Sequence, residues 1–294
     1  MPRPAARHAT RWTLRPADEH NAARLSLSLC LHRAIGRTLA ARGWDEPEAC
    51  RAFLEPRLAS LHDPFLLRDM DRAVERTLRA IRAGERITVF GDYDVDGVSS
   101  TALMVTVLRR LGADPGYFIP HRVNDGYGMH RSSVEDIARA GTQLLITVDT
   151  GVTAMEEVRA AAALGMDVVV TDHHLAEGDV LPDAVAIVNP NRPDALYEPG
   201  RLCGVGVAFK FAHALMKASG AAREESVDFL RGLLDLVALG TIADVVPLLG
   251  ENRVLARFGL ERLGLTTRPG LRALIEETID RCEGSIPRAA RILE

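Results

Sequence analysis

The pattern of hydrophobic and polar positions changes twice along the chain, and its first part is helical. Apolar residues recur at helical spacing in residues 22–32 and 69–83, and between these segments Asp45 and Pro47 are typical of a helix start. The pattern therefore predicts an N-terminal helical segment that covers residues 1–84.

From residue 85 onward, short apolar runs alternate with segments of helical spacing. The predicted strands cover residues 87–90, 116–119, 144–148, 168–171 and 184–188, and the predicted helices between them cover 100–111, 132–140 and 154–164. Beyond residue 204 the helical period returns, over 207–217, 227–239, 252–263 and 271–278. We therefore predict an α/β fold class, a parallel sheet flanked by helices, followed by a helical C-terminal part.

Polar residues stand at the tips of four of these elements. Three aspartates lie within five residues just after the first predicted strand, and each of the other tips carries an Asp. Carboxylates this close together repel one another unless a positive charge neutralises them. The residues are Asp92, Asp94 and Asp96 after 87–90; Asp149 after 144–148; Asp172, His173 and His174 after 168–171; and Asp244 within the apolar stretch 239–247.

Each tip also has a plainer interpretation, because Asp often forms turns or caps helices. The carboxyl ends of parallel strands share one edge of a sheet, however, so the Asp94–Asp96 pair is expected to meet Asp149 and His173. Carboxylates together with imidazole suit Mn²⁺ or Mg²⁺, and several carboxylates can hold two ions with one of them bridging. The pattern therefore favours a metal site for hydrolytic phosphoryl transfer.

Two glycine-rich segments carry weaker signals. After the second predicted strand, Arg122 could contact a phosphate and Tyr127 could face a base or sugar, although a packing loop is the simpler explanation. The segment Gly204–Gly206 lacks the third Gly of a dinucleotide fingerprint. It indicates close packing or a helix start, with phosphate contact as the lesser alternative.

Composition narrows the class of protein. A net charge of −4 gives no electrostatic sign of a nucleic-acid binder, and 47% hydrophobic with 26% charged residues is ordinary for a soluble globular protein. The 4 cysteines form no C-x-x-C pair, which fits a reducing compartment. There is no signal-peptide core and no apolar run long enough to cross a membrane. We therefore expect a cytoplasmic protein without a membrane partner.

Several motifs resemble the DHH phosphoesterase superfamily. The resemblance rests first on Gly91–Gly97 together with Asp172–His174. Further matching motifs are Leu61–Met70, Asn124–Gly128, Leu202–Lys210 and Ala238–Leu248. The matching region covers residues 12–265 and is similar to bacterial exonucleases that degrade single-stranded DNA from the 5′ end. By this resemblance, residues 85–265 are the DHH phosphoesterase catalytic domain.

The resemblance also implies a cofactor and a set of site residues. It implies two divalent metal ions, Mn²⁺ preferred or Mg²⁺, held by Asp94, Asp96, Asp149, His173 and Asp244, with Asp149 bridging and Asp92 as a further ligand or a neighbour of the ligands. His174 would assist phosphate binding or catalysis, alongside Arg122 and Tyr127 as substrate contacts. The implied activity releases 5′-mononucleotides from single-stranded DNA during repair and recombination in the bacterial cytoplasm. A single-strand-binding protein or a helicase is the implied partner.

The resemblance departs at the C-terminus. Enzymes of this kind continue into a second, glycine-rich domain, whereas this chain stops at Glu294, and residues 266–294 resemble the linker toward that domain. We therefore expect a fragment, a chain that needs a partner, or a weakly active enzyme. Two alternatives stay open: a nano-RNase or nucleotide bisphosphate phosphatase of the same superfamily, and a non-catalytic nucleic-acid-binding or regulatory relative. The presence of all implied ligands weighs against the non-catalytic relative.

Overall fold

The structure is a computed structural model that describes residues 13–122, 128–195, 197 and 202–281 of the chain. The chain divides into two compact units, Met1–Pro56 and Arg57–Glu294. The described part of the smaller unit contains α1 (Glu19–Ser28), α2 (Arg33–Ala41) and α3 (Pro47–Leu54). These amphipathic helices bury Leu25, Leu39 and Cys50 in a small core of their own.

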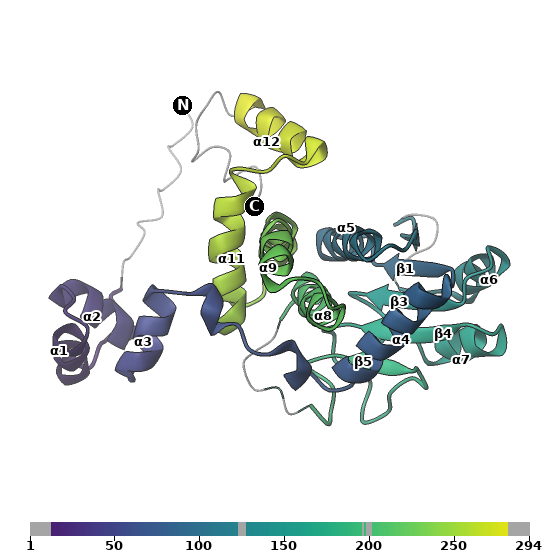
Figure 1. The fold of residues 1–294 in the computed structure, drawn as a ribbon. Helices are drawn as coiled ribbons and strands as arrows, with labels where there is room; N and C mark the ends of the chain where they lie inside the picture. Colours follow the sequence, from purple (N-terminus) through teal and green to yellow (C-terminus); the bar gives the residue numbers. More distant parts are fainter. Residues whose placement is uncertain (1–12, 123–127, 196, 198–201, 282–294) are drawn as a thin grey trace, which may run out of the picture. The chain divides into compact units, whose positions relative to one another are not determined.

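A five-stranded parallel sheet forms the centre of the larger unit, with the strand order β2-β1-β3-β4-β5 (Figure 1). The strands are β1 (Ile87–Gly91), β2 (Gly116–Phe118), β3 (Leu144–Val148), β4 (Asp167–Thr171) and β5 (Ala186–Val188). Gly91 pairs with Val148, and Val148 pairs with Thr171, so β1, β3 and β4 end level with one another. The predicted α/β fold with a parallel sheet is confirmed, and the residues that follow these three strands emerge side by side.

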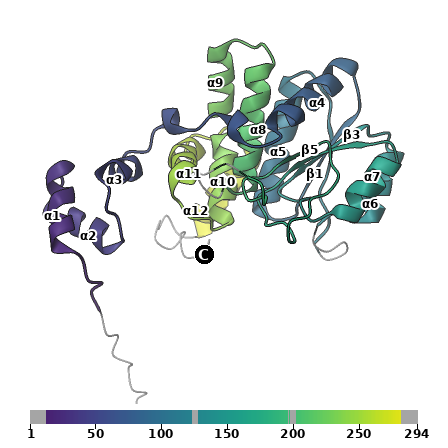
Figure 2. The same cartoon turned by 90° about the horizontal axis from the view of Figure 1, so that it is seen from below.

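Helices cover both faces of this sheet (Figures 1 and 2). One face carries α6 (Arg131–Arg139) and α7 (Met155–Ala163), and the other carries α4 (Met70–Ala83), α5 (Val95–Arg110) and α8 (Gly204–Ala218). Side chains alternate between the two faces along each strand. Leu145 packs with residues of α6 and α7, and Ile146 packs in the core on the side of α4, α5 and α8. Because both faces are covered, β1, β3 and β5 are buried along their whole length and β4 is buried beyond its first residue, which is why their sequence runs showed no alternation.

The chain completes the larger unit with helices beyond the sheet. These are α9 (Arg223–Arg231), α10 (Leu234–Ala243), α11 (Gly250–Leu263) and α12 (Pro269–Arg281), and two short 3-10 helices, η1 (Leu58–Ser60) and η2 (Pro64–Leu66), precede α4. Helix α10 packs against α5, α8 and α11. Within the described residues, no helix is long and apolar enough to cross a membrane.

Several predicted helix boundaries differ from the structure, and two of these differences change the elements most. Helix α5 begins at Val95 and not at Ser100, because the Asp94 side chain accepts a 2.9 Å hydrogen bond from the Gly97 amide and caps the helix early. The helix predicted over 227–239 is two helices, since α9 ends at Arg231 and α10 begins at Leu234. The early start of α5 places Asp96 inside its first turn.

Candidate metal centre

The predicted polar tips meet at the carboxyl edge of the sheet. Asp92 and Asp94 follow β1, Asp149 follows β3, and the Asp172–His174 segment follows β4. These three strands are neighbours in the sheet and end level, which brings the residues after them together. The end of α10 adds Asp244 from the helical part of the chain. The predicted convergence is therefore confirmed.

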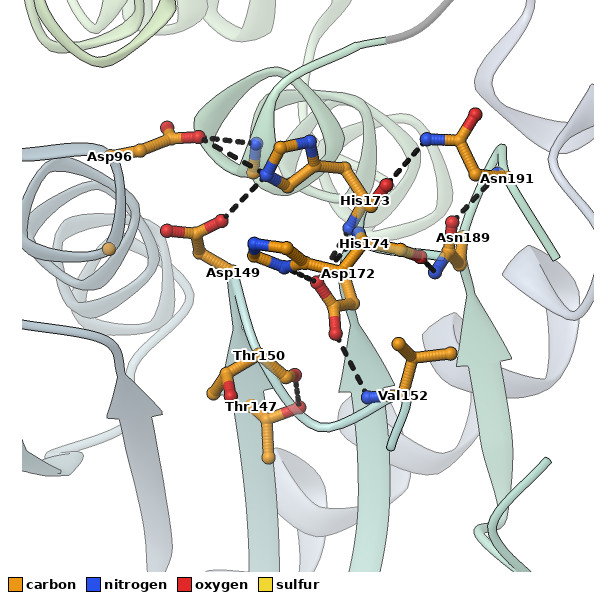
Figure 3. Close-up of polar contacts among 12 residues, drawn as sticks. Asp96, Thr147, Asp149, Thr150, Val152, Asp172, His173, His174, Asn189 and Asn191 are labelled. Atoms are coloured by element: carbon orange, nitrogen blue, oxygen red, sulfur yellow. Dashed lines mark hydrogen bonds and ion pairs between the residues drawn. The ribbon is translucent and has the colours of Figure 1, made fainter. Parts of the chain in front are cut away.

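His173 lies at the centre of these carboxylates (Figure 3). Its Nε2 atom is 3.1 Å from Asp149 Oδ1 and 3.9 Å from both Asp96 Oδ2 and Asp244 Oδ2. One imidazole nitrogen thus faces acidic side chains that come from α5, from the end of β3 and from the end of α10. This arrangement concentrates negative charge around a single point.

Three groups of side chains could each hold a metal ion. Within each group, the ligand atoms all lie within 4.8 Å of one another. Asp149 belongs to two of the three groups. The groups are Asp92, Asp94 and Asp149; Asp149, His173 and His174; and Asp96, His173 and Asp244. All six predicted metal ligands are therefore in place, together with His174, and the ligand role of those six stays a prediction.

Several atoms of this cluster are buried without a hydrogen-bond partner. They are both carboxylate oxygens of Asp149, Oδ1 of Asp92 and Nε2 of His173. Although Asp149 Oδ1 and His173 Nε2 are 3.1 Å apart, their geometry does not make a hydrogen bond. A buried polar atom without a partner is costly, and a cation is the partner that oxygen and imidazole nitrogen atoms share. The residues present therefore fit a divalent metal ion.

Burial makes these carboxylates hard to ionise when no cation is bound. Burial raises the pKa of Asp149 to about 10, and the charges of Asp96 and Asp94 add to the effect. Burial likewise raises the pKa of Asp96 to about 6, although backbone amides oppose it, and it raises the pKa of Asp92 and of Asp244. The site is thus electrostatically incomplete without a positive charge.

Asp172 is the site residue that sequence reasoning left without a role. Its buried carboxylate accepts hydrogen bonds from the amides of Val152 (2.9 Å), His173 (2.7 Å) and His174 (3.1 Å). It also lies 2.8 Å from the Nδ1 atom of His174. The sequence signal for this role was the position of Asp172. The side chain of an Asp directly after a buried strand can accept hydrogen bonds from backbone amides near the end of that strand.

The Asp172 carboxylate also sets the charge of His174. The hydrogen bond with Asp172 raises the pKa of His174 to about 9, against the opposing effect of burial. For Asp172, burial alone would raise the pKa, but the interactions with His174 and the Val152 amide lower it. Asp172 therefore favours the protonated form of His174, with Nδ1 held by the carboxylate and Nε2 directed away from Asp172 (Figure 3).

Two asparagines after β5 hold the His173–His174 backbone in place. Asn191 Nδ2 donates to the His173 carbonyl at 2.5 Å, and Asn189 Nδ2 donates to the His174 carbonyl at 2.9 Å. The sequence analysis did not identify either residue. Their contribution is visible only once β5 is placed beside β4.

The two predicted substrate contacts, Arg122 and Tyr127, differ in whether the structure describes them. Arg122 is exposed, and its guanidinium carbon lies 5.2 Å from the centre of the Tyr93 ring, next to Asp92 and Asp94 in sequence. The predicted substrate contact at Tyr127 lies outside the described residues. Arg122 is thus a basic side chain held over an aromatic ring that follows β1.

This fold and cluster define a class of protein. The model described as "DHH family, N-terminal domain" matches residues 86–241, and the chain belongs to the DHH family. The matched region includes β1, β3 and β4 and ends within α10. It therefore contains the strand ends that carry most of the cluster.

Within that family, the chain is similar to exonucleases called RecJ. It is 43% identical over 266 residues to the single-stranded-DNA-specific exonuclease RecJ of Bacillus subtilis, an alignment that covers 90% of this chain and 32% of that protein. A crystal structure of exonuclease RecJ bound to manganese matches with a TM-score of 0.68 and 37% identity, covering 81% of this chain and 56% of the other. RecJ of Thermus thermophilus in complex with Mn²⁺ matches with a TM-score of 0.73 and 30% identity, covering 96% and 42%. The chain thus spans a minor part of the length of its curated relative.

Proposed function

We propose that this chain carries the metal centre of a phosphodiesterase that removes 5′-mononucleotides from single-stranded DNA. The observation that carries the proposal is the buried cluster around His173, in which oxygen and nitrogen atoms lack partners. The similarity to proteins named single-stranded-DNA-specific exonuclease supports the substrate. The manganese in a similar structure supports the cofactor.

The proposed ligands are shared among the three groups of ligand atoms. Asp94, Asp96, Asp149, His173 and Asp244 would hold two divalent ions, Mn²⁺ or Mg²⁺, with Asp92 as a further ligand or a neighbour. Asp149 is the proposed bridge because, of the two residues that belong to two of the three groups, Asp149 and His173, it is the one whose side chain has two ligand oxygens. When bound, such ions activate water and stabilise the charge that develops on the phosphate.

The residues around the ligands would bind and orient the phosphate. The Asp172 carboxylate raises the pKa of His174 to about 9, which favours a protonated imidazole whose Nε2–H would donate to a phosphate oxygen. Arg122 would contact a phosphate of the strand near its 5′ end. The working compartment is then the bacterial cytoplasm, where a helicase or a single-strand-binding protein would present the strand.

The direct test is an assay of the purified chain with Mn²⁺ on 5′-labelled single-stranded DNA. We expect labelled mononucleotides from single strands, none from blunt duplex DNA, and no product from Asp149→Ala. Faster turnover of dinucleotides or nucleotide bisphosphates would replace the long-strand substrate with a small one. Absence of hydrolysis in a chain that binds Mn²⁺ would contradict the proposal that this chain is itself the nuclease.

A further inference from the structure

The start of helix α8 holds the Asp96 carboxylate by both of its oxygens. The Gly204 amide donates to Asp96 Oδ2 at 2.6 Å, and the Val205 amide donates to Asp96 Oδ1 at 2.8 Å. Amides in the first turn of a helix have no partner within the helix, and the helix dipole favours a carboxylate at that end. The carboxylate of Asp96, 1% exposed, is therefore oriented by a segment 108 residues away in the chain.

The same helix start also touches Asp149. A Cβ atom added to Gly204 would lie 2.3 Å from Asp149 Oδ1 and 2.5 Å from its Cβ and Cγ. Asp149 has little room to retreat, because it is 1% exposed and has a left-handed backbone with φ 61°. The backbone at Gly204 therefore sets how far this carboxylate extends.

Helix α10 confines Asp96 from another direction. A Cβ added to Gly240 would lie 2.7 Å from Asp96 Oδ1 and 2.7 Å from Val205 Cγ1. Gly206, two residues further along α8, is different, since the atoms nearest to its added Cβ would be Leu202 side-chain atoms at 3.3 Å and not a carboxylate. The approach to a carboxylate oxygen is thus a property of Gly204 and Gly240 and is not shared by Gly206.

We propose that Gly204 and Gly240 are positioning residues of the metal centre, where the bare backbones of α8 and α10 set the spacing between the carboxylates of Asp96 and Asp149. This inference rests on the proposed function of Asp96 and Asp149 as metal ligands. A side chain at either glycine displaces a carboxylate that is already fixed by amides or by its strand end. The expected consequence is weaker binding of the divalent ion.

The first test compares Mn²⁺ affinity, by calorimetry or by titration of the Mn²⁺ electron-paramagnetic-resonance signal, among three single variants. We expect Gly204→Ala and Gly240→Ala to bind Mn²⁺ about 10–100-fold more weakly than the wild-type chain, the range for residues that orient metal ligands. Gly206→Ala, in the same helix, is the matched control and should keep the wild-type affinity. Wild-type affinity in both test variants would overturn the inference.

The second test needs no metal and separates the contact from a general folding defect. All three nearest atoms that an added Cβ at Gly204 would meet belong to the Asp149 side chain. We therefore expect Gly204→Ala to lower the melting temperature of the metal-free wild-type chain, and to lower it much less in an Asp149→Gly background. Equal losses in the two backgrounds would refute the contact.

The two tests also separate this inference from the proposed function. A wild-type chain that binds no Mn²⁺ would overturn the proposed metal centre, whatever the glycine variants do. The stability cycle between Gly204 and Asp149 would then still decide whether α8 positions the carboxylate. Mn²⁺ binding with additive stability losses would retain the metal centre and reject the positioning role.

Discussion

At the residue scale, Asp149 combines several unfavourable features in one place. Its carboxylate is 1% exposed and has no hydrogen-bond partner, and its backbone is left-handed. Val245, which follows Asp244, is also left-handed with φ 58°, a conformation that a β-branched residue rarely adopts. Strained residues of this kind persist where the surrounding structure holds them, often at functional sites.

We predict that Asp149→Asn abolishes hydrolysis while it stabilises the metal-free chain. Asn tolerates the left-handed backbone, and it removes a buried carboxylate that lies near other acids. The loss of activity should exceed the roughly 10–100-fold that loss of an outer residue of a metal site produces. Metal-free melting curves and exonuclease assays provide the two measurements, and a lower melting temperature in Asp149→Asn would contradict this account.

We predict that Asp172→Ala destabilises the chain and also weakens activity. The change leaves the amides of Val152 and His173 without their acceptor, at about 1–3 kcal/mol for each buried group left unpaired. It also releases His174 from its carboxylate partner. Urea unfolding measures the first effect. For the second, kcat should fall even at temperatures where the variant is fully folded, and an unchanged kcat there would reject the positioning of His174.

A further prediction concerns acid stability and lies away from the metal centre. Asp69 accepts hydrogen bonds from Arg192 Nη1 at 2.7 Å and from the Ile187 amide at 3.2 Å. Burial alone would raise the pKa of Asp69, but these partners reverse the effect and lower the pKa below the ordinary 3.8. Because the folded-state pKa is depressed, the stabilisation is present above the unfolded-state value and is lost as pH falls through the folded-state pKa.

Asp69→Asn should therefore lower the free energy of unfolding at pH 7, by about 1.5–3 kcal/mol for a hydrogen bond to a charged group. The difference from the wild-type chain should shrink as pH falls below 3.8, the ordinary carboxyl value. Urea titrations at several pH values measure it. A difference that stays constant with pH would show that Asp69 does not act through its charge.

At the element scale, a buried ion pair fixes α8 against α11. Lys210 Nζ lies 2.8 Å from Glu251 Oε1, with side-chain exposures of 0% and 2%. Lys210 also donates to the His62 carbonyl at 2.6 Å, and the Tyr197 hydroxyl donates to Glu251. This network joins α8 and α11 to the segment between η1 and η2, and it holds the helix whose first turn orients Asp96.

We predict that Glu251→Ala destabilises the larger unit by about 3–5 kcal/mol, because it leaves the Lys210 ammonium buried without a counter-charge. Replacing both residues, as in Lys210→Met with Glu251→Leu, should cost less than Glu251→Ala alone, since no charge is then left unpaired. Urea unfolding of the three proteins measures the coupling. A double variant less stable than Glu251→Ala would show that the pair itself, and not the burial of one charge, provides the stability.

The strand and helix boundaries show which local sequence signals were sufficient to predict an element. The apolar runs located all five strands, most clearly the central ones, which are buried on both faces and end at polar tips. The start of α5 was placed too late, since Asp94 was considered as a metal ligand and not as the helix cap that it also is. The division between α9 and α10 at Gly232 was missed, because the apolar period continues across it.

At the scale of the whole molecule, metal binding should stabilise one unit and not the other. The candidate site lies entirely within Arg57–Glu294, whereas α1–α3 form a separate core in Met1–Pro56. A ligand that binds only the folded state stabilises it by about 2.7 kcal/mol at 100 times its dissociation constant. Mn²⁺ should therefore raise the stability of the larger unit.

Hydrogen exchange with and without Mn²⁺ measures this effect. We expect slower exchange of amides in β1, β3, β4 and the first turn of α8, and unchanged exchange in α1–α3. Addition of EDTA should reverse the change. Equal protection of both units would contradict the separation, and no protection in either would contradict the metal centre.

Local patterns in the chain were enough to identify the parallel α/β class and the acidic tips that form the candidate site. Strand and helix periods act over a few residues, and the geometry of a parallel sheet then brings Asp149 and His173 to one edge. The orientation of those side chains depends on contacts between distant segments, such as the amides of Gly204 and Val205 on Asp96. Hydrogen-bond direction and close packing create these contacts, and neither has a local period, so they became visible only in the folded chain.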